Sequence, residues 1–513
     1  MLFINPAVDP ETQPELFNPF IYTSFPTAIG YLAGYLRHNS HIKPLIWDEQ
    51  INFLNKKILE ELISKLPVPK IIGITCLTGT ASRAFKITHL IKEIDDSLII
   101  IMGGIHSTAL PEECLDRSAA DIIVRGEGEI TLKEIHDALC SGSDWSNIPG
   151  ISFRKENTIQ HNPTRPLVDD LSEFPPFPYD LFADNIDSYK DFGTVISSRG
   201  CPFNCIFCSQ RLISGQKYRF LPTERVISKI KLLVEKYNQR KIFFVDDTFT
   251  INHKRTYELL DAIISTGLNK KVGFIVESRA KEINWDLLVK MKEANVLSIA
   301  YGVETGSERL MRTLNKKETV QDNIDAIHLT HRAGIASDAS LIFGLPTETK
   351  HDRKITSRLV RKLPLDGARF NIAIPYPGTY FYQTAIKEKR LNKKDDWINF
   401  SNQHYLMSDN LPYSPAGTVN SQLVFEVFMA NILYTLRPKI LINLLFSAFM
   451  SGGTVLSINK NWYTSPHMFY KILKLLMFLL KRAMIITFKG GILAKLKKYR
   501  GKHDEDSFKN QRG

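Results

Sequence analysis

Three cysteines in one short loop are the residues of this chain best suited to chemistry. Cys201, Cys205 and Cys208 stand in the segment CPFNCIFCSQ at a C-x3-C-x2-C spacing. Three thiolates on a tight loop are soft ligands that suit an iron–sulfur cluster or zinc. A closed site of either kind needs four protein ligands, and no fourth cysteine lies nearby in the sequence. The loop therefore leaves one metal position open, as a reactive centre requires.

Two structural alternatives to a reactive metal centre exist. A Cys3His zinc site would need His161 or His253 as its fourth ligand, although neither stands at a local ligand spacing. A disulfide framework fits less well, because only six cysteines occur in 513 residues and no targeting pattern opens the chain. We expect a reduced cytoplasmic protein in which the remaining cysteines, Cys76, Cys114 and Cys140, are small apolar groups.

The pattern of apolar and polar residues predicts the helices and strands that must position this loop. A hydrophobic content of 43% and a charged content of 23% predict a folded chain of two or three domains. Residues 1–140 alternate short apolar runs with helical patterns, which predicts a doubly wound parallel sheet with helices on both faces. Its strands are expected at Leu2–Asn5, Pro44–Trp47, Ile71–Thr75, Leu98–Met102 and Asp121–Val124. Its helices are expected at Thr27–His38, Lys56–Leu66, Ser82–Ile94 and Glu129–Leu139.

The loops after three of these strands carry a threonine and several glycines. Ligands of a doubly wound sheet bind beyond the carboxyl ends of its strands, and glycine lets a bulky ligand approach the backbone. These loops contain Thr75, then Gly103 and Gly104, then Gly126, Glu127 and Gly128. The sequence therefore predicts a ligand site at this edge of the first sheet.

A proline-rich connector, residues 141–190, leads to a second region of strand–helix alternation, residues 191–400. The connector contains a short hairpin-like piece, Gly150–Phe153 and Thr158–Gln160. The second region predicts a partial (β/α)6 barrel, whose active-site residues would stand at the carboxyl ends of the strands. Its strands are expected at Val195–Ser198, Ile242–Val245, Val272–Val276, Leu297–Tyr301, Ser340–Phe343 and Ala368–Ile372.

Charged residues and glycine follow several of the predicted barrel strands. They are Asp246, Asp247, Arg279, Glu304 and Gly344. Each charged residue also has a structural alternative: Glu304 could pair with Arg279, and Asp246 could cap the next helix.

The cysteine loop, with Phe207 before its last cysteine, resembles that of the radical S-adenosylmethionine (SAM) enzymes. The segments GVETGS, LIFGLPTET and PYPGT resemble motifs of the same family. The resemblance implies that the three cysteines hold a [4Fe–4S] cluster whose fourth iron binds SAM. It further implies one SAM contact for each strand end. Asp246 and Asp247 would lie at the methionine amino group, Arg279 at the carboxylate, Glu304 at the ribose, and Phe207 and Gly344 at the adenine.

The first region resembles the cobalamin-binding domain that precedes many radical SAM domains. The similar segments are FPTAIGYLAGYLR, GGIHSTALPEECL and DIIVRGEGEITL. The resemblance implies cobalamin contacts from the three strand-end loops, that is from Thr75, Gly103, Gly104, Gly126, Glu127 and Gly128. The D-x-H-x-x-G motif is absent, so we expect cobalt without a protein histidine ligand. His106 is then expected to support its loop or to contact a ligand amide.

The two resemblances together imply a radical SAM enzyme that methylates an unactivated carbon through a deoxyadenosyl radical. Oxidative cyclisation or ring rearrangement is the alternative reaction. A zinc-stabilised binding protein without catalysis is the alternative of another class. An electron donor such as flavodoxin or ferredoxin would be a partner.

The last region, residues 401–513, is predicted to be mainly helical and becomes basic at its end. Helical segments are expected at Leu423–Leu436, Ile440–Met450 and Met468–Ile486, and residues 467–513 carry 12 Lys or Arg against 3 Asp or Glu. No apolar run reaches the roughly 18 residues of a membrane span. Mixed apolar and basic residues favour peripheral contact with an anionic membrane and a lipid-like substrate; a helical cap with a solvated tail is the alternative. No nucleic acid is expected, because a binding motif and aromatic platforms are missing.

Overall fold

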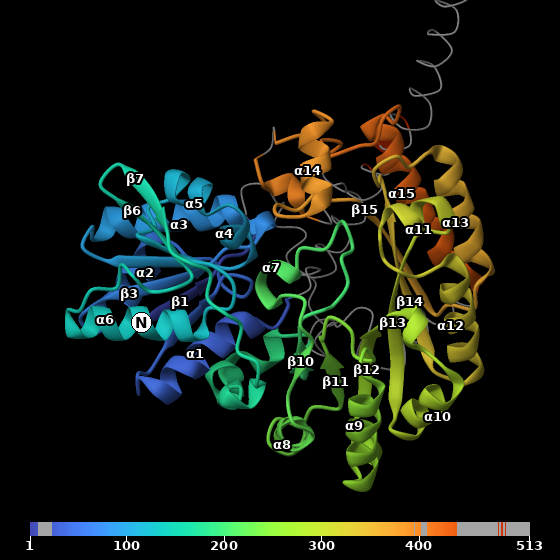
Figure 1. Cartoon of the computed structure of the whole chain (residues 1–513), viewed down its shortest axis with the longest axis horizontal. Helices are drawn as coiled ribbons and strands as arrows, with labels where there is room; N and C mark the ends of the chain where they lie inside the picture. The colour runs from blue at the N-terminus through green and yellow to red at the C-terminus, as the bar shows by residue number, and fades with distance from the viewer. Residues whose placement is uncertain are drawn as a thin grey trace, which may run out of the picture.

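Two parallel sheets, each surrounded by helices, form the frame of the molecule (Figure 1). The computed structural model describes residues 1–8, 23–393, 396–401 and 408–438, with the single positions 481, 484, 485 and 488. The first sheet is blue in Figure 1, and the second runs from green to orange beside it. The predicted fold class, a doubly wound sheet followed by a partial barrel and a helical C-terminal region, is confirmed.

The first sheet has the strand order β2-β1-β3-β4-β5-β6-β7. Its first five strands are parallel, and β1 lies between β2 and β3, so the strand order reverses there. Open sheets bind ligands at such a reversal, beyond the carboxyl ends of the strands. The strands are β1 (Leu2–Asn5), β2 (Leu45–Asp48), β3 (Ile71–Thr75), β4 (Ile99–Gly103), β5 (Ile122–Val124), β6 (Ile151–Lys155) and β7 (Thr158–His161).

Helices cover both faces of the first sheet because successive strand side chains point to opposite sides. Leu2 and Ile4 pack in the core that contains α2 and α3, whereas Phe3 packs in the core that contains α1 and α6. The helices of this region are α1 (Thr27–Asn39), α2 (Lys56–Ser64), α3 (Ala81–Ile94), α4 (Ile105–Ala109), α5 (Pro111–Arg117) and α6 (Glu129–Ser141). They confirm the four predicted helices to within a turn and add α4 and α5.

The hairpin of the connector, β6 and β7, belongs to the first sheet. β6 pairs antiparallel with β5, and Ile122 lies opposite Phe153. Ile151 and Phe153 are buried in the α1 and α6 core, which explains why the hairpin joins this sheet. The sheet therefore extends past residue 140, where we expected the first domain to end.

The proline-rich part of the connector is anchored by aromatic rings. Phe25 contacts five rings at centroid distances of 4.9–5.9 Å. These rings belong to Phe177, Tyr179, Phe182, Tyr189 and Phe192. The short 3-10 segments Leu171–Glu173 and Tyr179–Ser188 shape this strap between the two sheets.

The second sheet has the order β15-β14-β13-β12-β11-β8, and all its neighbours are parallel. Because β8 and β15 do not pair with each other, the barrel is open on one side. The strands are β8 (Thr194–Val195), β11 (Lys241–Phe244), β12 (Gly273–Ser278), β13 (Val296–Glu304), β14 (Ala336–Phe343) and β15 (Gly367–Ile372). Its helices are α8 (Thr223–Glu235), α9 (His253–Ser265), α10 (Trp285–Glu293), α11 (Glu308–Thr313), α12 (Val320–Arg332) and α13 (Lys350–Lys362).

A small ribbon and three further helices complete the described structure. The ribbon, β9 (Ser198–Arg199) with β10 (Arg219–Phe220), and α7 (Arg211–Ser214) frame the cysteine loop. α14 (Tyr380–Lys387) follows the barrel, and α15 (Asn420–Thr435), which confirms a predicted helix, packs along β15.

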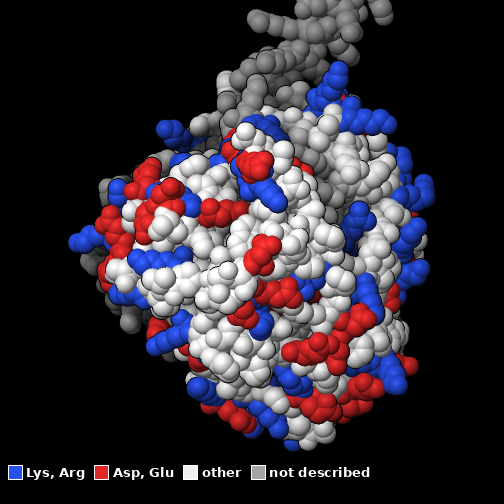
Figure 2. All heavy atoms as spheres, turned by 60° about the vertical axis from the view of Figure 1, so that its left-hand side comes forward, with Lys and Arg blue, Asp and Glu red and all other residues white. Residues whose placement is uncertain are grey.

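The other two tail helices and most of the basic segment 467–513 lie outside the described residues. No helix of the described part is long and apolar enough to cross a membrane. On the face that Figure 2 shows, uncharged residues cover much of the centre, Asp and Glu form several separate groups, and Lys and Arg line the upper right-hand edge.

Candidate active site

The cysteine loop follows β9 through a glycine that no other residue could replace without strain. Gly200 has φ +88°, and a Cβ there would lie 2.3 Å from the carbonyl oxygen of Lys217. The loop is held at both ends by its backbone. The N–H of Cys201 donates to Gly215 O at 3.4 Å, and that of Cys208 donates to Cys205 O at 3.2 Å.

The middle of the loop is tied to the far side of the barrel. The Ile206 N–H donates to Leu314 O at 3.1 Å, and the Phe381 N–H donates to Ile206 O at 2.9 Å. Phe207 packs against the small core that contains Leu345 and Phe381. The loop is thus fixed by backbone bonds from α11 and α14 as well as from its own ends.

The three thiols of the loop are partly buried. Burial raises the pKa of Cys201 and Cys205, and that of Cys208 to about 11. Three cysteines on one loop that leave a further metal position open suit an iron–sulfur cluster.

Neither histidine of the zinc alternative is available to the loop. His161 Nδ1 lies 2.9 Å from Ser152 Oγ, and its Nε2 lies 3.1 Å from Glu112. His253 Nε2 lies 2.8 Å from Glu282 O. Both rings have partners outside the cysteine loop, so neither His161 nor His253 serves as its fourth ligand.

The two aspartates after β11 face different partners. The buried carboxylate of Asp246 accepts the N–H groups of Ser197 and Ser198 at 2.7 and 2.8 Å, so it fixes the chain that enters the cysteine loop. Asp247 accepts one N–H, from Gly200 at 3.1 Å, and burial raises its pKa to about 6. Asp247 is thus the carboxylate that remains open to a ligand.

Arg279 and Glu304 do not pair with each other, as the structural alternative required. The guanidinium of Arg279 lies 3.5 Å above the ring of Phe203, in the cysteine loop, and its Nε lies 3.4 Å from Glu318. Glu304 pairs with Lys316 Nζ at 3.3 Å, and burial raises its pKa. Lys316 also lies 3.2 Å from Glu318, so a buried network of four charges lines this wall.

Sequence reasoning missed Lys316 and Glu318. They follow α11 in the stretch LNKKET, which has the composition of an ordinary solvated loop and no motif that marks it.

Gly344 ends β14 in a conformation that favours glycine. Its φ is +91°, and a Cβ there would lie 2.8 Å from Leu423 of α15. Its N–H donates to the buried carboxylate of Glu348, whose pKa burial raises to about 7. The turn therefore depends on packing against the C-terminal helix.

A cavity of about 310 Å³ lies where the carboxyl ends of the two sheets meet. From the first sheet it is lined by all six residues predicted to contact cobalamin: Thr75, Gly103, Gly104, Gly126, Glu127 and Gly128. From the barrel side it is lined by Ile196, Ser198, Arg199, Val245 and Asp247, among others. Both sets of strand-end loops thus open into one space.

The cavity has the character of a site for a large, mainly apolar ligand. Leu77 and Val245, which line it from opposite sheets, are 49% and 42% exposed. Large apolar groups left open to solvent at the mouth of a cavity are covered when a ligand binds. The glycines of the loops leave room along the backbone: Gly104 has φ +112° and Gly126 has φ +77°. A flat macrocycle such as a corrin fits this lining.

Buried ion pairs join the two sheets beside the cavity. Arg199 pairs with Glu127 at 3.2 Å and with Glu129 at 2.7 Å. Arg219 pairs with Glu127 at 2.8 Å. Although burial opposes its charge, Glu129 and Glu127 raise the pKa of Arg199. Glu127 is thus a link between the domains as well as a residue of the cavity wall.

His106 lies behind the cavity and does not line it. Its ring is fully buried against Trp397, at 4.7 Å between ring centroids, and burial lowers its pKa to about 4. The described residues that line the cavity include no histidine.

Comparisons with known proteins agree with both halves of this site. The family model of the radical SAM superfamily matches residues 195–360, and that of the B12 binding domain matches residues 21–136. An uncharacterized methyltransferase of Pyrococcus horikoshii is 33% identical over 446 residues, 85% of this chain and 93% of the relative. The anaerobic magnesium-protoporphyrin IX monomethyl ester cyclase of Rubrivivax gelatinosus is 27% identical over 369 residues, 70% of this chain and 66% of the relative.

Two solved structures share the fold. The methyltransferase TsrM of Kitasatospora setae, with cobalamin and a [4Fe–4S] cluster bound, aligns with a TM-score of 0.67 at 15% identity, covering 85% of this chain and 89% of TsrM. OxsB with aqua-cobalamin and SAM bound aligns with a TM-score of 0.61 at 22% identity, covering 82% of this chain and 60% of OxsB.

Proposed function

Because this chain belongs to the radical SAM enzymes that carry a B12-binding domain, we propose that it methylates an unactivated carbon of a small-molecule substrate. Its cofactors are a [4Fe–4S] cluster, SAM and cobalamin. One observation carries the proposal: a single cavity touches the predicted cobalamin loops and Asp247 at the barrel mouth. A corrin in that cavity would lie next to the site where SAM is cleaved.

The chain's own residues would bind and orient the three cofactors. The bound cofactors would supply one-electron cleavage of SAM and transfer of a methyl group. Cys201, Cys205 and Cys208 would hold the cluster, in a loop that backbone bonds keep in place. Asp246 would act as a positioning residue, because its carboxylate is committed to Ser197 and Ser198.

The SAM contacts would come from the strand ends. Asp247, which has one N–H partner, would accept a hydrogen bond from the amino group of SAM's methionine part. Arg279, whose guanidinium lies above the ring of Phe203, would bind the carboxylate of the same part. Glu304 would bind the ribose hydroxyls, for which Lys316 favours its ionised form. Phe207 and Gly344 would border the adenine; the missing side chain of Gly344 supplies the space.

The cobalamin would contact backbone atoms of the first sheet's loops on one side and side chains of the barrel on the other. Thr75, Gly103, Gly104, Gly126 and Gly128 would let the corrin approach the strand ends. Leu77 and Val245 would close the site against solvent and so shield the reacting groups from side reactions. Glu127, held by two arginines, would keep the two walls of the cavity together.

Anaerobic reconstitution tests the proposal. Purified protein should bind about four iron and four sulfide, cleave SAM when reduced, and retain hydroxocobalamin through gel filtration. Its cobalt(II) EPR spectrum should lack nitrogen coupling from an axial histidine. Cys205→Ser should lose the cluster and SAM cleavage while retaining corrinoid, and Cys140→Ser, in the exposed part of α6, is the matched control.

Two results would contradict it in different ways. Colourless protein with one zinc in the cysteine loop and no SAM cleavage would leave a binding protein without catalysis. Cluster and SAM cleavage without corrinoid retention would leave a radical SAM enzyme that does not use cobalamin.

Cyclisation is the second candidate reaction, favoured by the 27% identity to a cyclase over 70% of this chain. The two reactions differ in their products. Methyl transfer adds one carbon, taken from SAM, to the substrate, whereas ring closure only removes hydrogen. Labelled SAM methyl groups in the product would therefore identify methylation.

The partners we propose are an electron donor such as flavodoxin or ferredoxin and, through residues 467–513, the surface of an anionic membrane. The support for membrane contact is compositional, because these residues carry 12 Lys or Arg against 3 Asp or Glu. Flotation with anionic liposomes at low salt, with and without this segment, tests it. Full-length protein that stays with the soluble fraction would exclude the contact and remove the argument for a lipid-like substrate.

A further inference from the structure

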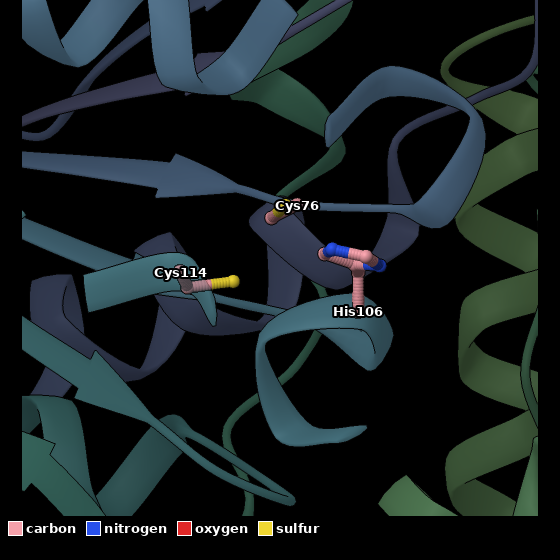
Figure 3. Close-up of side chains that lie close together, drawn as sticks. All are labelled: Cys76, His106 and Cys114. Atoms are coloured by element: carbon pink, nitrogen blue, oxygen red, sulfur yellow. The ribbon is translucent and has the colours of Figure 1, made fainter. Parts of the chain in front are cut away.

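A second set of metal-ligand side chains lies in the first domain, apart from the cysteine loop. Cys76 follows β3, His106 belongs to α4 and Cys114 belongs to α5, and Figure 3 shows the three side chains converging. One ligand atom from each lies within 4.8 Å of the others. All three residues are fully buried, with no exposed surface. The sequence predicted small apolar roles for these cysteines, because their spacing, 38 residues apart, has no local pattern.

The histidine has no partner that would explain its burial. Within the described part of the chain, neither Nδ1 nor Nε2 of His106 forms a hydrogen bond. Burying a polar group without a partner costs roughly 1–3 kcal/mol, and native structures avoid it. An imidazole that is fully buried, unpartnered and beside two thiols has the surroundings of a metal ligand.

The backbone holds this arrangement rigidly. The Cys76 N–H donates to Gly103 O at 2.7 Å, and the His106 N–H donates to Cys76 O at 3.1 Å. Gly104 makes the turn between them at φ +112°, where a Cβ would lie 2.9 Å from Cys76 O. The side chains therefore need little rearrangement to close on an ion.

The site is also covered from the barrel side. The ring of Trp397 packs edge-on to His106, and its indole N–H donates to Glu113 Oε1 at 2.6 Å. Trp397 itself is fully buried. This cover keeps solvent away from the ligand atoms.

Charge and ligand softness select the ion. Two thiolates and a neutral imidazole around a divalent cation carry no net charge, whereas a monovalent ion would leave a negative charge in an apolar core. Thiolate and imidazole suit zinc rather than magnesium or calcium, which take oxygen ligands. The buried hydroxyl of Ser107, which follows His106 in the chain and forms no hydrogen bond within the described part, would supply an oxygen as the fourth ligand.

We propose that Cys76, His106 and Cys114 bind a structural Zn²⁺ ion. The ion would join the end of β3 to α4 and α5. Thr75, Leu77, Gly104 and Ile105, which flank its ligands in the sequence, all line the large cavity. The metal would therefore stiffen the wall of that cavity without contacting its ligand.

Metal analysis of the reconstituted, full-length protein tests this. We expect one zinc per chain that survives dialysis against EDTA, and X-ray absorption at the zinc edge should show two sulfur and at least one imidazole neighbour. His106→Ala and Cys114→Ser should each lose the zinc but keep iron and sulfide. Cys140→Ser, which changes an exposed thiol, should keep both metals.

A second measurement covers the case in which these variants fail to fold. The triple variant Cys201→Ala, Cys205→Ala, Cys208→Ala lacks the cluster's absorbance, so Co²⁺ can be read directly. One Co²⁺ per chain with tetrahedral d–d and thiolate charge-transfer bands supports the proposal. No zinc and no Co²⁺ uptake, zinc with only nitrogen and oxygen neighbours, or a disulfide between Cys76 and Cys114 detected by alkylation would each overturn it.

Discussion

Replacing Arg199 by methionine tests whether the buried ion pairs hold the two walls of the cavity together. Arg199 belongs to β9, and its guanidinium joins Glu127 and Glu129 of the first domain. It also lies 4.8 Å above the ring of Tyr31 and 4.9 Å above that of Phe174. Methionine keeps much of the side-chain volume and removes only the charge and its hydrogen bonds.

The expected loss in the free energy of unfolding depends on which carboxylate is left without a partner. Glu127 keeps Arg219, whereas Glu129, whose side chain is 7% exposed, loses the cation 2.7 Å away. Removing one partner of a buried pair costs about 3–5 kcal/mol, because it leaves an uncompensated charge. The double variant Arg199→Met, Glu129→Gln leaves no such charge, so it should cost about 1–2 kcal/mol. The single variant Glu129→Gln, in which Arg199 keeps Glu127, should also cost about 1–2 kcal/mol. The two single losses together then exceed the loss of the double variant by at least ~2 kcal/mol, which is the expected coupling free energy.

The assay is urea denaturation of the cofactor-free protein, with the first transition followed by tryptophan fluorescence. Lys217→Met is the matched control, because Lys217 and Asp169 form a pair with side chains 62% and 70% exposed, and such pairs contribute about 0–1 kcal/mol. The arginine variant should also lose hydroxocobalamin on gel filtration. A coupling free energy below ~0.5 kcal/mol, or a loss no larger than that of the control, would refute the reasoning.

Two further substitutions test single backbone and carboxylate positions. Gly104→Ala should lower the free energy of unfolding by about 3 kcal/mol, since φ is +112° and the new Cβ would lie 2.9 Å from Cys76 O. Gly142→Ala is the control: at φ +70° with no atom within 4 Å, it should cost about 1–2 kcal/mol. Equal losses of stability in urea denaturation would contradict the predicted clash at Gly104. Asp352, in the capping box of α13, accepts hydrogen bonds from three residues that outweigh burial and hold its pKa well below its usual range. Its contribution is therefore fully present above pH ~4 and is lost gradually as the pH falls toward the lowered pKa, so Asp352→Asn should cost about 1–3 kcal/mol at pH 7 and progressively less below pH ~4. Asp322→Asn, in the more exposed capping box of α12, should cost about 1 kcal/mol at pH 7, and a pH-independent loss for Asp352→Asn would contradict the linkage.

Local patterns were enough to predict most of the fold. β1 and β3 have the predicted bounds, and the six predicted barrel strands all appear, because apolar runs bounded by polar loops mark buried strands. The segment predicted as one strand at Val195–Ser198 is two, β8 and β9, because the N–H groups of Ser197 and Ser198 turn away from the sheet and donate to Asp246. The hairpin Thr158–Gln160 was found, but its membership of the first sheet depends on Phe153 reaching a core made by distant helices.

The parts of the site that could not be predicted depend on contacts between distant segments. Cysteine spacing and glycine at strand ends mark ligand loops locally, so the six loop residues expected to contact cobalamin could be named from the sequence, and all six line the cavity. No local sequence pattern marks Lys316 or Arg199 as a site residue. Their role depends on ion pairs formed in the folded chain, Lys316 with Glu304 and Arg199 with Glu129. Trp397 likewise reaches His106 across 291 positions of sequence, and only its packing explains it.

The end of β11 connects the two halves of the site. Three successive residues there have three different partners. Val245 lines the cavity, Asp246 accepts the N–H groups of Ser197 and Ser198 at the start of the cysteine loop, and Asp247 accepts the N–H of Gly200 next to Cys201. Because consecutive residues of an extended chain point in alternate directions, one rigid strand end can set the cavity wall and the cluster loop at the same time. One strand end thus positions both the barrel-side wall of the cavity and the cysteine loop, while the ion pairs of Arg199 and Arg219 hold the wall from the first domain against them.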